Sequence, residues 1–127
     1  MSKEIIKTKN APDAIGPYSQ AVEIPESGLI FVSGQLPINP KNNEIGSDIK
    51  TQTFQSLKNI KEILNKGNYS MDNIVKMTVF LKDINEFKQM NEVYETFFTE
   101  KFPARCAVQV ACLPKDAKIE IEAIANK

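Results

Sequence analysis

The chain has 127 residues, none of which is histidine, and only two are cysteine. Without histidine, a Ser-His-Asp or Cys-His nucleophilic centre is impossible, and so is a zinc site with imidazole ligands. Two cysteines alone cannot form a structural zinc site. Cys106 and Cys112 would lie about 20 Å apart in an extended strand, too far for a disulfide. These absences favour a reducing compartment and a function that needs no metal or other cofactor.

Net charge and long apolar runs are also absent. Lys+Arg and Asp+Glu both number 16, so no global charge attracts nucleic acid or an anionic membrane. No apolar run approaches the length that spans a bilayer, and the first ten residues lack the apolar region of a signal peptide. We therefore expect a cytoplasmic protein that binds neither nucleic acid nor membrane. Its length predicts one compact domain over residues 1–127.

Hydrophobic periodicity predicts six strands and two helices. The expected strands cover 3–9, 20–24, 29–33, 74–81, 105–112 and 118–125. Asp48 is the expected N-cap of the first helix and Gly67 its C′ glycine, with a long surface loop over 36–47 before it. Asp83 and Glu86 resemble a capping box for a second helix that runs to about Glu100. This order predicts an α+β domain with both helices on one face of a mixed sheet.

The second face of this sheet is expected to be apolar for a solvent-exposed surface. Ala107, Ala111, Thr78 and Ile124 are its candidate residues. An open apolar sheet face commonly marks an association surface.

The last two predicted strands alternate strictly and are separated by a turn at 113–116. If they pair and share one core, Cys106 faces that core, whereas Arg105 and Glu120 lie together on the other side. Gln109 would then lie opposite Glu120, about 13 Å along the strand from Arg105. The long side chains of Arg105 and Glu120, at that separation, could hold a small molecule between them.

Several motifs in this order resemble the YjgF/RidA family of enamine/imine deaminases. They are Ile15-Gly16-Pro17-Tyr18-Ser19-Gln20, Phe31-Val32-Ser33-Gly34-Gln35, Asn91-x-x-Tyr94, Pro103-Ala104-Arg105 and Ile119-Glu120-Ile121. The resemblance extends over nearly the whole chain. It implies a chorismate-mutase-like α+β fold and a homotrimer with three clefts between subunits.

The resemblance also implies hydrolysis of short 2-imino acids, such as 2-iminopropanoate and 2-iminobutanoate, to 2-oxo acids and ammonia. Arg105 would hold the substrate carboxylate, and Glu120 would aim a water at the imine carbon. The backbone of Gly34, with Tyr18 and Ser33, would orient the imine. The substrate-binding set is completed by Asn91 and Ala107.

Each of these residues also has an ordinary structural interpretation. Arg105 and Glu120 could occupy the solvated face of a strand, and without the resemblance that is the simpler interpretation. Tyr18 could be a packing aromatic, Ser33 and Gly34 a plain turn, and Asn91 a cap for a nearby loop.

The chain departs from the family pattern beside the arginine. Many relatives have cysteine two residues after it, whereas this chain has Ala107 there and Cys106 one place earlier. Since alternation turns Cys106 toward the core, we expect no thiol in the chemistry.

Two other functions stay open. One is an endoribonuclease activity, which is also claimed within the family; the neutral charge argues against it, because phosphate contacts dominate nucleic-acid affinity. The other is a non-enzymatic module that binds small carboxylates or docks a partner at the same cleft.

Overall fold

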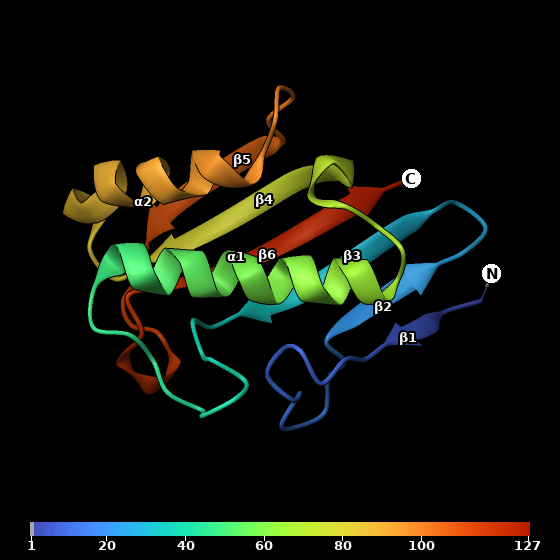
Figure 1. Ribbon diagram of the computed structural model, residues 1–127, viewed down its shortest axis with the longest axis horizontal. Coiled ribbons are helices and arrows are strands. Elements are labelled where there is room, and N and C mark those ends of the chain that lie inside the picture. Colours follow the sequence, from blue (N-terminus) through green and yellow to red (C-terminus); the bar gives the residue numbers. More distant parts are fainter. Residues whose placement is uncertain (1) are drawn as a thin grey trace.

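The computed structural model describes residues 2–127, in which six strands form one sheet. In sheet order they are β1 (Glu4–Ile6), β2 (Ala21–Ile24), β3 (Leu29–Gln35), β6 (Ile119–Asn126), β4 (Ile74–Leu81) and β5 (Ala104–Gln109). The helices α1 (Ile49–Lys66) and α2 (Phe87–Tyr94) lie over the same face of this sheet (Figure 1). Short 3₁₀ turns cover Met71–Asn73, Ile84–Glu86, Glu95–Phe97 and Pro114–Asp116.

The predicted mixed sheet is confirmed, because β4 and β5 run parallel while all other neighbours are antiparallel. The predicted hairpin of the last two strands is wrong. Strand β4 lies between β5 and β6 and pairs with both (Figure 1). Alternation indicates which face a side chain occupies, but it does not say which strand lies next to which.

The hydrophobic core lies between the sheet and the helices. Strand β6 contributes its odd-numbered residues, and Ile119 and Ile121 are fully buried. Opposite them α1 contributes Leu57, Ile60 and Leu64, also fully buried. The alternating pattern of β6 therefore places its even-numbered residues, including Glu120, on the face without helices.

The first helix begins and ends almost as predicted. Asp48 accepts a hydrogen bond from the Thr51 amide at 2.7 Å, as an N-cap does. Gly67 follows the last helical residue, but its φ is −91°, and the left-handed residue is Asn68 with φ 65°. Asparagine tolerates this conformation better than most residues.

Several other predicted boundaries are wrong, including the end of β5, which lies at Gln109 and not at residue 112. Strand β1 ends at Ile6 and not at residue 9, because the buried Gln20 side chain takes over the hydrogen bonds of the next segment. The second helix ends at Tyr94 and continues as a 3₁₀ turn. Asp83 caps the preceding 3₁₀ turn through the Asn85 amide, and Glu86 instead forms a 3.9 Å ion pair with Lys118.

The face of the sheet opposite the helices carries apolar side chains, as expected. Phe31 and Ile124 are paired between β3 and β6, and Phe31 is exposed. Thr78 belongs to this face and lies opposite Glu122. Ala107 does not, since it packs against the core on the helix side. Ala111 is exposed but lies beyond the end of β5.

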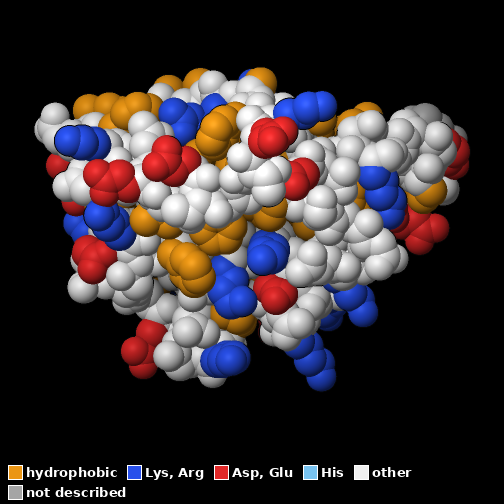
Figure 2. Space-filling view, turned by 45° about the horizontal axis from the view of Figure 1, so that its top comes forward, with side chains coloured by type: hydrophobic (Ala, Val, Ile, Leu, Met, Phe, Trp, Pro, Cys, Tyr) orange, Lys and Arg blue, Asp and Glu red, His pale blue; other side chains and the backbone are white. Residues whose placement is uncertain are grey.

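Charged side chains of both signs are interspersed over the surface that Figure 2 displays, in keeping with a net charge of zero. Within residues 2–127, no helix is both long enough and apolar enough to cross a membrane. The cytoplasmic location stays a prediction.

The buried side-chain amide of one α1 residue, Asn59, holds the backbone of the 36–47 loop in place. Asn59 is fully buried, and its Nδ2 donates to the carbonyls of Leu36 and Ile38 at 3.2 and 3.0 Å. Asn59→Ala leaves these acceptors without a partner, and we expect the free energy of unfolding to fall by about 2 kcal/mol. Urea denaturation measures this loss. Asn65→Ala, at an exposed position of the same helix, is the control; equal losses in both variants would contradict the role of the amide.

Candidate functional site

Glu120 lies on the central strand β6, on the face without helices. The residue paired with it on the adjacent strand β4 is Phe80. Burial, and secondarily the negative charge of Glu122, raise the pKa of the Glu120 carboxyl above its ordinary value of 4.5. The proton is therefore released at a higher pH than from an exposed glutamate.

The Glu120 carboxylate packs directly on the backbone of β3. A Cβ atom at Gly34 would lie 2.6 Å from Glu120 Oε2, so no other residue fits there without moving the carboxylate. Here the pairing of β3 with β6 is irregular between Val32 and Gln35. Such irregularities locally interrupt the ladder and re-aim side chains. Gly34 therefore allows the close approach of the Glu120 carboxylate to the backbone of β3.

A cavity of about 760 Å³ lies beside this contact and unites four of the predicted residues. Tyr18, Ser33, Gly34 and Glu120 all line it. Lys115, which also lines it, has a left-handed φ of 58° in the turn before β6.

Hydrogen bonds from neighbouring residues hold the Tyr18 loop. The hydroxyl of Ser33 donates to the carbonyl of Ser19 at 2.6 Å, so its proton is not free to orient a substrate. Gln20 is buried, and its amide contacts the backbone of Thr8 and Pro12. Tyr18 itself is 52% exposed and is therefore available to a ligand.

Arg105 lies on the edge strand β5, on the side of the helices. Its Nη1 donates to Asn91 Oδ1 at 2.6 Å. The guanidinium carbon lies 4.7 Å from the ring centroid of Tyr94 and 5.2 Å from that of Phe87. Arg105 and Asn91 line a second cavity, of about 450 Å³, with Phe102 at its rim.

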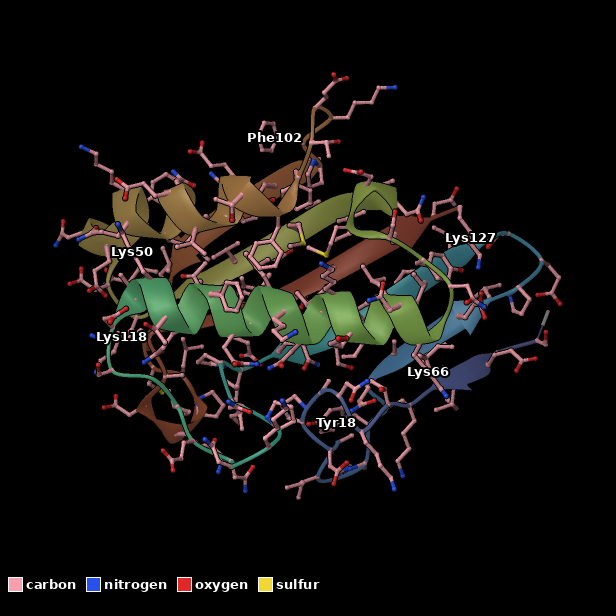
Figure 3. The ribbon with its side chains drawn as sticks, in the orientation of Figure 1. Tyr18, Lys50, Lys66, Phe102, Lys118 and Lys127 are labelled. Atoms are coloured by element: carbon pink, nitrogen blue, oxygen red, sulfur yellow. The ribbon has the colours of Figure 1, made fainter. Side chains whose placement is uncertain are left out.

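The prediction that Arg105 and Glu120 share one side of the sheet is wrong. On β4, the residue paired with Arg105 is the fully buried Met77, whereas the residue paired with Glu120 is Phe80 on the other face. The two cavities have no lining residue in common. Tyr18 of one cavity and Phe102 of the other lie at opposite sides of the molecule (Figure 3). One chain thus contains two separate parts of the predicted site.

Because the odd-numbered residues of β5 face the helices, the predicted positions of three further residues are also wrong. Cys106 is exposed and does not face the core, and Ala107 is turned toward the helices. Gln109 accepts a hydrogen bond from the Ile84 amide at 2.9 Å and is not paired with Glu120. On this edge strand Cys106 and Val108 lie on the open face, whereas α2 packs over the face that carries Arg105.

Phe87 and Tyr94, the aromatic neighbours of Arg105, had no predicted functional role. Their spacing from Asn91 could have indicated that they lie beside the site, because residues three and four apart share a helix face. Within residues 2–127, no three His, Cys, Asp or Glu side chains gather as a metal site would require. That no cofactor is bound stays a prediction.

The family model described as endoribonuclease L-PSP matches residues 8–127. The chain belongs to this family. Its curated relatives include the 2-iminobutanoate/2-iminopropanoate deaminase of Escherichia coli strain K12, 53% identical over 128 residues with 98% of each chain covered. A RutC family protein of Pyrococcus horikoshii is 56% identical over 126 residues, again with 98% of each chain covered.

Solved structures of the endoribonuclease L-PSP family have the same fold. The crystal structure of the E. coli YjgF gene product has a TM-score of 0.93 and 51% identity, with 98% of each chain covered. That of E. coli TdcF with bound serine has a TM-score of 0.93 and 49% identity at the same coverage. The resemblance to the YjgF/RidA proteins and the α+β fold are confirmed.

Removing the neighbouring charge should change the titration of Glu120. In Glu122→Gln, we expect the pKa of Glu120 to fall toward its ordinary value and to stay above it, because burial is the larger cause of the shift. Carboxyl ¹³C NMR during a pH titration measures this. Glu44→Gln, on the 36–47 loop, should leave the pKa unchanged. An unaltered titration in Glu122→Gln would show that the two carboxylates do not interact.

Proposed function

We propose that this chain hydrolyses short 2-imino acids to 2-oxo acids and ammonia. The observation that carries the proposal is the half-buried Glu120 carboxylate, held against Gly34 in a cavity that Tyr18 also lines. The 53% identity to a protein named for this reaction supports it over the full length of the chain.

Glu120 would act as the base for a water molecule. The water oxygen attacks the electrophilic imine carbon, and Glu120 takes up the proton that this oxygen loses. This proton passes to the imine nitrogen, so that the carbon carries one hydroxyl and one amino group. Glu120 then takes the remaining hydroxyl proton and delivers it to the same nitrogen, the carbon–nitrogen bond breaks, and ammonia leaves as the carbon–oxygen double bond forms. The raised pKa of Glu120 strengthens it as a base, because general-base efficiency rises as the pKa approaches the operating pH.

Arg105 would bind the substrate carboxylate with its planar guanidinium. Since Arg105 and Glu120 lie on opposite faces of the sheet, a site that uses both needs two copies of the chain. The exposed Phe31 and Val108 on the open face support such an association. We infer a homotrimer in which Arg105 of one subunit and Glu120 of the next share a cleft.

A coupled assay tests the function. An amino-acid oxidase generates 2-imino acids in the presence of semicarbazide, and faster hydrolysis lowers the amount of semicarbazone. We expect less semicarbazone and more ammonia when the protein is added. Carboxylate binding without this effect would favour a binding module, and salt-sensitive RNA cleavage that is lost in Arg105→Ala would favour an endoribonuclease.

Glu120 and Glu122 should differ sharply in the same assay. Glu120→Gln keeps the size of the side chain but removes the base, so we expect kcat to fall about 10²–10⁴-fold. Glu122 is the control on the same strand face. Glu122→Gln keeps the base and removes only the smaller cause of its raised pKa, so kcat should fall far less than in Glu120→Gln. Sedimentation must show intact oligomers for both variants. Wild-type turnover by an intact Glu120→Gln oligomer would refute the mechanism.

Mixing two inactive variants tests whether the cleft is shared. Arg105→Ala and Glu120→Gln chains, unfolded together and refolded at equal concentrations, should form mixed trimers in which about one cleft in four has both native residues. We expect about a quarter of the wild-type activity, whereas each variant refolded alone stays inactive. No recovery in mixtures that contain mixed trimers would place both residues of a working site on one chain.

A further inference from the structure

The guanidinium of Arg105 lies against two aromatic rings and forms no ion pair among the described residues, although Glu95 lines the same cavity. None of the ion pairs within residues 2–127 includes Arg105. Its hydrogen-bond partner is the neutral amide of Asn91. In the part of the chain that the structure describes, no ion pair thus engages this half-buried guanidinium.

One face of α2 forms this environment. Phe87, Asn91 and Tyr94 are four and three residues apart and so lie along one side of the helix. Both ring centroids are within the range of a cation–π contact with the guanidinium carbon. The helix itself is anchored by Met90, which is fully buried.

Aromatic contacts orient an arginine without using its hydrogen-bond donors. A guanidinium has five N–H groups, and Nη1 of Arg105 donates to Asn91. The rings restrict the rotamers of the side chain, which lowers the entropy that must be lost when a ligand binds. An acidic partner would also orient the side chain, but it would occupy the donors and neutralise the charge.

We propose that Phe87 and Tyr94 are positioning residues that hold Arg105 ready to bind a substrate carboxylate. The inference rests on the proposed function, in which Arg105 binds that carboxylate. The rings do not touch the reacting atoms. They act on substrate affinity through the guanidinium and leave the chemical step to the part of the site that contains Glu120.

Two substitutions of Tyr94 distinguish the contribution of its ring to substrate affinity from that of its hydroxyl. This oxygen is buried without a hydrogen-bond partner in the described chain, and Tyr94 is only 4% exposed. Since the cation–π contact needs the ring alone, Tyr94→Phe should keep wild-type affinity. Tyr94→Leu removes the ring and should weaken binding.

The experiment compares ring variants with a matched control. We expect Phe87→Leu and Tyr94→Leu to raise the KM for the imine, and the Kd for 2-oxobutanoate, about three- to tenfold with kcat within about twofold. Phe54→Leu is the control, because Phe54 is 51% exposed on α1, packs on Phe97 and is neither of the rings at the Arg105 guanidinium. Unchanged affinity in both leucine variants, or equal loss in Tyr94→Phe and Tyr94→Leu, would overturn the proposal.

A double-mutant cycle separates positioning from general packing. In an Arg105→Ala background, Phe87→Leu should have no further effect on 2-oxobutanoate binding, measured by NMR titration. The same loss in both backgrounds would show that Phe87 acts by packing, and the proposal would fail. If the wild type binds 2-oxobutanoate and the cycle is non-additive, but no imine is hydrolysed, the positioning role stands and the proposed function fails.

Discussion

The alternation of side chains along β6 is the constraint on which the rest of the structure depends. This strand is paired on both sides, with β3 and with β4, and its odd-numbered residues are buried under the helices. A shift of one residue would bury Glu120 and Glu122 and expose Ile119 and Ile121, at a large cost in apolar burial and charge desolvation. The position of Glu120 on the open face therefore follows from the packing of the core.

The two charged groups of the candidate site, Arg105 and Glu120, are each positioned by a strand and not by a loop. Glu120 is placed by a central strand, and Gly34 leaves space for its carboxylate at an irregular point of β3. Arg105 is placed by β5 and by the face of α2 that packs on it. Because these parts are on opposite faces, the fold keeps the cationic and acidic groups of one chain from neutralising each other. Association of copies would bring complementary parts together.

Much of the fold could be predicted from the sequence because its signals are local. The periodicity of residues 74–81, the cap at Asp48 and the turn between β2 and β3 depend on neighbours along the chain, and the structure confirms them. The motif residues Tyr18, Ser33, Gly34 and Glu120 line one cavity, and their roles there stay a prediction. The side of β5 was not predictable in this way. Cys106 and Val108 are as apolar as core residues, yet they lie on the open face, since α2 covers the face of Arg105.

The sequence by itself determined the element types, the family and the chemical groups available, since composition, periodicity and motif order belong to the chain alone. Only the tertiary structure decided that β4 separates β5 from β6 and turns Arg105 away from Glu120. Pairing between strands distant in sequence depends on the burial that the whole sheet achieves with its helices, and no short segment encodes that sum. For the same reason, the aromatic environment of Arg105 became visible only when α2 was packed on the sheet.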